Sequence, residues 1–115
     1  MTPDCVFCRI VAGQDPTREA YSGDMVYAFH DRQPVAPVHV LVVPRQHVED
    51  FAALGPEHGS ILGAMAVAAQ AVAKQEGVAN SGYRLVFNVG RDAGAAVPHL
   101  HLHLLAGRRL AWPPG

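Results

Sequence analysis

Apolar residues gather in short runs bounded by glycine or proline, a pattern typical of strands. Val38–Val43 is a β-branched run that Pro44 ends, and it predicts a strand covered on both faces. Ala20–Ser22 and Met25–His30 flank the dipeptide Gly23-Asp24, which predicts a hairpin. We expect two further strands, over Tyr83–Val89 and His99–Ala106.

A longer segment, from near Pro56 to about Glu76, carries apolar residues at helical spacing. The stripe expected to pack on a sheet consists of Ile61, Leu62, Met65, Ala69 and Val72. A short helix is expected over Cys5–Ala12. Too few helices separate the strands for a doubly wound parallel sheet. We therefore predict an α+β fold with a five-stranded, mainly antiparallel sheet, one long helix and one short helix.

The composition indicates one globular domain over residues 1–115, with 50% hydrophobic and 17% charged residues. The 9 Lys and Arg nearly balance the 10 Asp and Glu, so we expect no nucleic-acid partner. We expect neither a secretory signal nor a membrane span, because no apolar stretch has the required pattern or length. Two cysteines three positions apart cannot form a disulfide framework, so we predict a cytoplasmic protein with reduced thiols.

Histidine occurs seven times, and three of these residues alternate with leucine in His99–Leu104. In a strand this puts three imidazoles on one face, about 6–7 Å apart, and three leucines toward the core. The alternative is a polar strand face without chemical function. Imidazole can be a nucleophile, a proton donor or a metal ligand near neutral pH. Together with the small residues of Gly90–Ala96, whose N–H groups could cradle a phosphate, the row indicates a metal site or an anion site.

The segment His99–Leu105 matches the His-φ-His-φ-His-φ-φ signature of the histidine triad superfamily. Other segments that resemble this family are Phe29–Asp31, Pro34–His39, Leu41–His47 and Arg84–Asn88, and Trp112–Gly115 is similar to the ending of its Hint-like branch. The resemblance covers nearly the whole chain. It implies hydrolysis or transfer at the α-phosphorus of purine nucleoside monophosphate derivatives, of the phosphoramidase type. The reaction would proceed through a nucleotidyl-histidine intermediate.

The resemblance also implies roles for individual residues. His101 corresponds to the nucleophile, His103 to a residue on the phosphate oxygens, and His39 to a further histidine of the network. The other nucleotide-binding positions are Phe7, Ile10, Phe29, Asp31, Asn88, Gly94, Ala95, Ala96, Val97 and Trp112. An aromatic ring and a carboxylate two residues apart can stack a base and bind both ribose hydroxyls. Without the resemblance, a core Phe29, a loop-capping Asp31 and a turn-forming Asn88 are the alternatives.

The chain departs from the family pattern at Gly94-Ala95-Ala96-Val97, where relatives have Gly-Gln-Ser/Thr-Val. Each lost donor of a hydrogen bond is expected to cost roughly one to three powers of ten in rate. A non-enzymatic nucleotide-binding protein with a regulatory or interaction role therefore stays open as an alternative. Dinucleoside polyphosphate hydrolysis is a second alternative.

Cys5-Val6-Phe7-Cys8 is a C-x₂-C motif, which alone fits half of a zinc site, a redox pair or two unrelated thiols. Zinc needs four nitrogen or sulfur ligands. Zinc-bearing members of the family add a histidine at the position of His47 and the first triad histidine, here His99. The resemblance thus implies a structural Zn²⁺ on these four residues, and reduced free thiols are the alternative.

The resemblance further implies a homodimer whose sheet continues across the two-fold axis through the long helix and the Tyr83–Val89 strand. In that arrangement Trp112 reaches the partner's site. Two features of the sequence favour a dimer independently. Alanines surround the main apolar stripe of the helix, and an unpaired edge strand as apolar as Leu85–Phe87 would be prone to aggregation. His58, in the first helical turn, is expected to be exposed.

Overall fold

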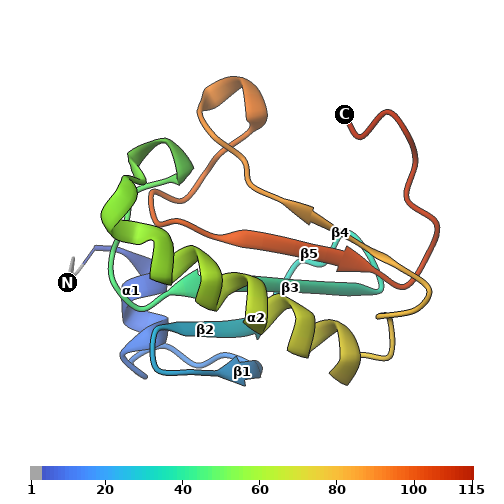
Figure 1. The fold of residues 1–115 in the computed structure, drawn as a ribbon, viewed down its shortest axis with the longest axis horizontal. Helices are drawn as coiled ribbons and strands as arrows, with labels where there is room; N and C mark the ends of the chain where they lie inside the picture. Colours follow the sequence, from blue (N-terminus) through green and yellow to red (C-terminus); the bar gives the residue numbers. More distant parts are fainter. Residues whose placement is uncertain (1–3) are drawn as a thin grey trace.

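The computed structural model describes residues 4–115 (Figure 1). Five antiparallel strands form one sheet in the order β1-β2-β3-β5-β4. The elements are α1 (Val6–Val11), β1 (Glu19–Ser22), β2 (Val26–His30), β3 (Val38–Pro44), α2 (Gly59–Gln75), β4 (Tyr83–Val86) and β5 (Leu102–Ala106), with short 3₁₀ turns at Phe51–Ala53, Pro56–His58 and Arg91–Ala93. The predicted α+β fold with one long and one short helix is confirmed.

The two faces of the sheet carry two separate apolar clusters. On one face, α2 packs against β1, β2 and β3, and the cluster includes Val40 of β3, Leu104 of β5 and Met65 of α2. On the opposite face, residues of α1 pack with Tyr27, Phe29, Leu41 and Val43. Because β3 lies under both clusters, six of its seven residues are buried, as its β-branched sequence predicts.

The last strand is shorter than predicted, because it begins at Leu102 and not at His99. Its neighbour β3 ends at Pro44, which has no N–H to offer to a ladder. The Pro44 carbonyl instead accepts a hydrogen bond from His99 Nε2 at 2.9 Å, and the Leu100 N–H donates to the Val48 carbonyl at 2.6 Å. The alternation of leucine and histidine continues before the strand begins, since Leu100, Leu102 and Leu104 are all buried in the apolar cluster on the α2 side of the sheet.

Further differences from the sequence-based expectation concern the end of β4, the start of α2 and the exposure of His58. β4 ends at Val86 and not at Val89, because Val86 pairs with His103 and β5 extends only one residue beyond that pair. The long helix starts at Gly59, after a 3₁₀ turn at Pro56–His58. His58 is half-buried and not exposed, because its Nδ1 accepts a hydrogen bond from the Gly55 N–H at 2.8 Å.

No helix in the described part of the chain has the length and apolar character needed to cross a membrane. The segment between β4 and β5 projects beyond the sheet and is orange in Figure 1. Its residues 90–96 are all exposed. This segment leads directly into the histidine-rich residues, so the site lies where an exposed loop meets the sheet.

Candidate active site and metal centre

The triad histidines lie on the sheet face opposite α2 but do not form an evenly spaced row. The ring centroids of His101 and His103 are 4.9 Å apart, closer than the predicted 6–7 Å, and the two ring planes meet edge to face at 63°. The His99 ring is fully buried and lies beside the two cysteine sulfurs. The triad is therefore divided between two places, with His99 in a Cys/His cluster and the other two in a histidine pair.

The hydrogen bonding of His101 defines which ring nitrogen is available for chemistry. Its Nδ1 lies 2.8 Å from the carbonyl oxygen of His99, which can only accept, so Nδ1 carries the proton. In the neutral ring Nε2 then holds the free lone pair. The edge of the Phe7 ring packs against the imidazole, with centroids 5.2 Å apart at 76°. These contacts orient the ring, and in the neutral form its Nε2 lone pair can act as a nucleophile.

His103 belongs to a series of hydrogen bonds that runs from Val35 through His39. In this series the ring proton lies on Nε2, whereas in His101 it lies on Nδ1. The Val35 N–H donates to His39 Nδ1 at 3.1 Å, so the His39 proton is on Nε2. That Nε2 lies 2.9 Å from His103 Nδ1 and 3.4 Å from Asp31 Oδ2. His103 Nδ1 therefore accepts, and the His103 proton is on Nε2. The His103 Nε2–H can therefore donate beside the ring of His101, whose Nε2 holds a lone pair.

Burial keeps His39 and His103 uncharged near neutral pH. It lowers the pKa of His103 to about 4, with the nearby His101 and His39 acting in the same direction and Asp31 opposing. Burial likewise lowers the pKa of His39, against the influence of Asp31. Asp31, His39 and His103 could in principle hold a metal ion. However, nitrogens sharing one zinc ion would be ~3.3 Å apart. The observed 2.9 Å is a hydrogen-bond length.

A cavity of about 420 Å³ opens beside His101. Asn88, Ala95, Ala96 and Val97 line it, as expected for residues around a phosphate. Gly94, at the start of that run, has a left-handed φ of +78° that glycine adopts without strain. Ala95 and Ala96 present no side-chain hydrogen-bond donor to the cavity. Any donors there must come from the backbone, from Asn88 or from other lining residues.

Sequence reasoning missed part of the cavity lining. Glu49, Asp50 and Phe51 follow β3 in an irregular segment, and the rings of Phe51 and Phe87 are 5.2 Å apart across the wall. No motif in the sequence marks these residues, because they reach the site only through the path of the chain between β3 and α2. Trp112 lies elsewhere, 81% exposed, on the C-terminal segment that Arg84 anchors by donating to the Ala111 carbonyl at 3.0 Å.

The predicted base-binding residues are buried in the second apolar cluster. Phe7, Ile10 and Phe29 are at most 7% exposed, and the Phe7 and Phe29 rings meet edge to face at 5.6 Å. Asp31 accepts a hydrogen bond from the Gln33 N–H at 2.9 Å through Oδ1, so it caps its loop while Oδ2 faces His39. The loop-capping interpretation of Asp31 is therefore correct, and it leaves the second carboxylate oxygen facing the histidine chain.

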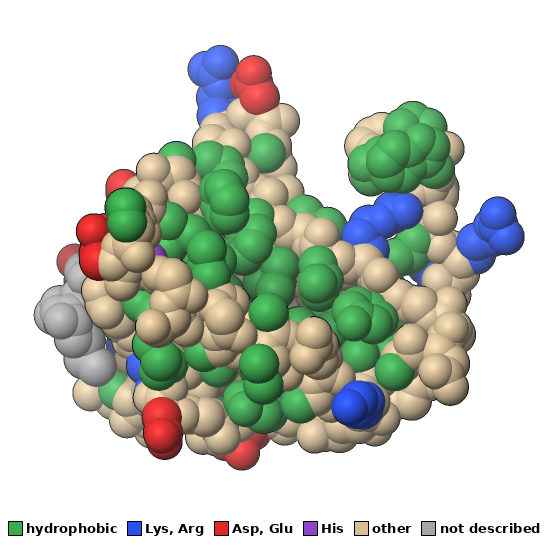
Figure 2. All heavy atoms as spheres, viewed as in Figure 1, with side chains coloured by type: hydrophobic (Ala, Val, Ile, Leu, Met, Phe, Trp, Pro, Cys, Tyr) green, Lys and Arg blue, Asp and Glu red, His purple; other side chains and the backbone are tan. Residues whose placement is uncertain are grey.

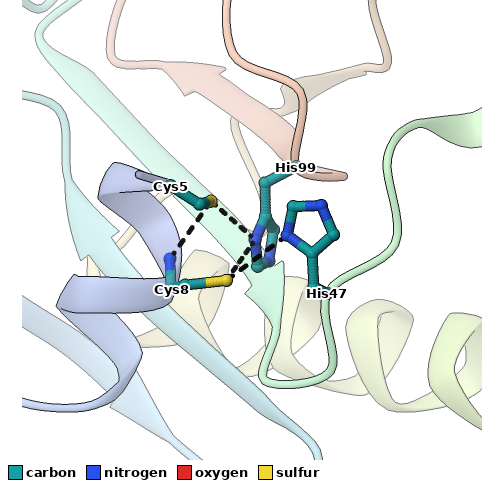
Figure 3. Close-up of side chains that lie close together, drawn as sticks. All are labelled: Cys5, Cys8, His47 and His99. Carbon is teal, nitrogen blue, oxygen red and sulfur yellow. Dashed lines mark hydrogen bonds between the residues drawn. The ribbon is translucent and has the colours of Figure 1, made fainter. Parts of the chain in front are cut away.

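Cys5, Cys8, His47 and His99 converge from three segments of the chain (Figure 3). Both cysteines are free and buried at the start of α1. His99 Nδ1 lies 3.3 Å from Cys5 Sγ and 3.6 Å from Cys8 Sγ, and His47 Nδ1 lies 3.3 Å from Cys8 Sγ. His99 Nε2 donates to the Pro44 carbonyl, which leaves the Nδ1 lone pair directed at the sulfurs.

These distances fit one tetrahedral metal ion. With zinc–sulfur and zinc–nitrogen bonds of ~2.3 and ~2.05 Å, a sulfur and a nitrogen on one ion are ~3.6 Å apart. The three observed separations lie within about 0.3 Å of that value. Two thiols and two imidazoles form a complete four-ligand set, so this Cys₂His₂ cluster could bind a metal.

Known proteins match this chain over nearly its whole length. Residues 12–110 match the HIT domain family. The sequence is 39% identical over 110 residues to the purine nucleoside phosphoramidase of Escherichia coli K12, covering 96% of this chain and 92% of that protein. It is 44% identical over 115 residues to a HIT-like protein of Synechococcus elongatus, covering both fully.

The fold also matches that of solved structures. A HIT family hydrolase from Legionella pneumophila superposes with a TM-score of 0.95 at 38% identity, covering 97% of this chain and 100% of that one. A histidine triad protein from Clostridium difficile gives 0.93 at 39% identity, covering 96% of both chains. The five-stranded sheet with one long helix is thus the fold of these proteins.

The lowered pKa of His103 predicts a loss of stability in acid. Between about pH 6.5 and 4 the unfolded chain binds a proton at this residue that the folded chain does not, so stability falls as pH falls. In urea unfolding, His103→Gln should remove about 1–3 kcal/mol of the decline between pH 7 and 4. From pH 7 to 8.5 the two proteins should differ by a constant amount. An unchanged slope in the variant would contradict the assignment.

Proposed function

This chain belongs to the HIT domain family, and on that premise we propose that it acts at the α-phosphorus of purine nucleoside monophosphate derivatives. Phosphoramidates are the proposed substrate class, as the name of the E. coli relative suggests. The observation that carries the proposal is the arrangement of His101, whose Nδ1–H is bound to a backbone carbonyl beside the cavity. We also propose that residues 1–115 act as a single domain.

The proposed reaction has two displacement steps. His101 Nε2 attacks the α-phosphorus, a phosphorus–nitrogen bond forms, and the bond to the leaving amine breaks. The leaving amine takes its proton from water, because Ala95 and Ala96 offer none. Water then attacks the same phosphorus and breaks its bond to His101. This second step releases the nucleoside monophosphate and a proton, and the proton neutralises the hydroxide left when water protonated the amine. The overall products are the nucleoside monophosphate and the free amine, and the imidazole is restored.

The neighbouring residues stabilise charge and position the nucleotide. His103 Nε2–H donates to a phosphate oxygen, and His39 keeps that proton in place through its 2.9 Å hydrogen bond. Asn88 and the backbone N–H groups of Ala96 and Val97 contribute further donors around the phosphate, whereas the N–H groups of Gly94 and Ala95 already donate to the carbonyls of Arg91 and Gly90. Phe7, Ile10 and Phe29 form the wall against the base, and Asp31 accepts from the ribose hydroxyls.

A second candidate function is nucleotide binding without turnover. It is favoured by Ala95 and Ala96, which line the cavity without supplying a side-chain donor to the leaving group. Both candidates use the same pocket, so only a turnover measurement separates them. Micromolar binding of a nucleoside monophosphate with no turnover on adenosine or guanosine phosphoramidate would favour the binding protein.

Replacing the nucleophile tests the enzyme proposal. His101→Ala should abolish phosphoramidate hydrolysis, while binding of the nucleoside monophosphate and the fold are largely kept, since the flanking leucines hold the segment in the core. His30→Ala is the matched control, because this histidine lies beside Glu76 at the end of α2 and should leave turnover intact. Near-normal kcat in His101→Ala would refute a covalent intermediate.

We further propose that the Cys₂His₂ cluster holds a structural zinc ion. Zinc would tie α1 to the segments that follow β3 and precede β5, and a four-ligand site leaves no position for a reacting water. Both thiols are free, as zinc ligation and the reducing cytoplasm require. We further propose a cytoplasmic location, which two reduced thiols favour.

Metal analysis tests this site. The purified protein should contain about one zinc per chain, and Cys5→Ser should release it and lower the melting temperature, because metal binding and folding are coupled. His30→Ala, which leaves all four ligands in place, should keep the metal. Protein prepared without chelator that contains no metal would refute the zinc site.

We also propose a homodimer formed through α2 and β4. β4 is an edge strand, with Leu85 46% exposed, and Val67 on α2 is 57% exposed. Figure 2 shows hydrophobic side chains gathered over the face that α2 covers, with few charged groups among them. A two-fold axis through this surface would pair identical patches and cover both edges. The exposed Trp112 would then contact the partner.

Light scattering at micromolar concentration should give a mass near twice the 12.3 kDa of one chain. Leu85→Lys should lower this mass by placing like charges at the two-fold axis. Deleting residues 112–115 should change substrate preference without dissociating the dimer, since the deleted segment lies outside α2 and β4. A wild-type mass near that of one chain would exclude the dimer.

A further inference from the structure

We propose that His99 is a positioning residue through which occupancy of the Cys₂His₂ metal site controls turnover at His101. The proposal rests on the function and the metal site proposed above. It assigns to the metal a catalytic consequence although the metal contacts no substrate. The connection is short, since His99 alone links the metal site to the His101 ring.

Four polar contacts of His99 point to this link. Its Nε2–H donates to the Pro44 carbonyl at 2.9 Å, at the end of β3. Its Nδ1 faces Cys5 Sγ at 3.3 Å and Cys8 Sγ at 3.6 Å. Its backbone carbonyl accepts the His101 Nδ1–H at 2.8 Å. The side chain that would ligate the metal therefore belongs to the residue whose carbonyl orients the nucleophile.

The sheet does not hold the His99 carbonyl in place. Residues 97–101 lie outside β5, and residues 90–96 before them are exposed. The backbone here is held by Leu100, whose N–H donates to the Val48 carbonyl at 2.6 Å. Val48 directly follows His47, another residue of the cluster. A metal ion joining the His47 and His99 side chains would therefore reinforce the same pair of segments from the other side.

Nucleotide binding depends on different contacts. Phe7 and Ile10 are held by apolar packing against β2 and β3. The far end of α1 is held by Arg45, whose Nη1 donates to the Val11 carbonyl at 3.4 Å. Loss of the metal should therefore leave the base wall largely in place and displace the His99 carbonyl. Displacement of a reacting group by about 1 Å can cost about 100-fold in rate.

The first experiment compares zinc-loaded and chelator-treated wild-type protein with His47→Ala, which removes one ligand without touching His101. Metal loss should lower kcat by about 10- to 100-fold, and added Zn²⁺ should restore it in the wild type. KM and the Kd of nucleoside monophosphate should change less than about threefold. Val72→Ala, at a buried position of α2, is the control for general destabilisation and should keep both metal and kcat.

The second experiment detects the hydrogen bond directly. In protein with ¹⁵N-labelled histidine, zinc should sharpen the His101 Nδ1–H signal and slow its exchange with water; His101→Ala identifies this signal. An apoprotein that keeps the signal and kcat overturns the proposal, as does a kcat loss of equal size in Val72→Ala. Absence of zinc binding refutes the metal site and this link together. Zinc binding without turnover refutes the enzyme proposal alone, and the ring signal then decides the link.

Discussion

A fully buried imidazole must find a partner for each ring nitrogen, and His99 shows how much of the site follows from that requirement. One nitrogen donates to the Pro44 carbonyl, and this contact replaces the ladder that a proline cannot continue. The other nitrogen is consequently an acceptor and faces two thiols. Among residues 4–115 no buried side-chain nitrogen or oxygen lacks a partner, so this pairing is part of a fully satisfied interior.

The alternation of leucine and histidine joins the stability of the core to the placement of the site. Leu104 is fully buried under α2, and shifting the register by one residue would put histidines into that apolar cluster. The large hydrophobic free energy of the leucines therefore fixes where the imidazoles lie. On the other face of β2 the same principle places Phe29 in the second cluster, beside the Phe7 ring that contacts His101.

Local patterns predict the parts of this structure that depend on local physics. The β1–β2 hairpin, the apolar stripe of α2 and the two-sided burial of β3 follow from spacing along the chain. The convergence of the Cys₂His₂ cluster was implied by family resemblance, and the structure brings its four residues together. Strand ends were predicted less well, because β5 begins where it does through one contact between His99 and Pro44. The 49–51 segment of the cavity wall carries no pattern, since its place depends on the whole path from β3 to α2.

The two histidines of the candidate active site have opposite proton arrangements, and the backbone imposes both. A backbone acceptor, the His99 carbonyl, puts the proton of His101 on Nδ1 and frees Nε2. A backbone donor, the Val35 N–H, puts the proton of His39 on Nε2, and this in turn puts the proton of His103 on Nε2. Burial lowers the pKa of His103 and so keeps that ring neutral near pH 7. An acceptor and a donor thus stand side by side without a buried charge on His103, because the His99 carbonyl is held against the His101 ring and the Val35 N–H acts on His103 through His39.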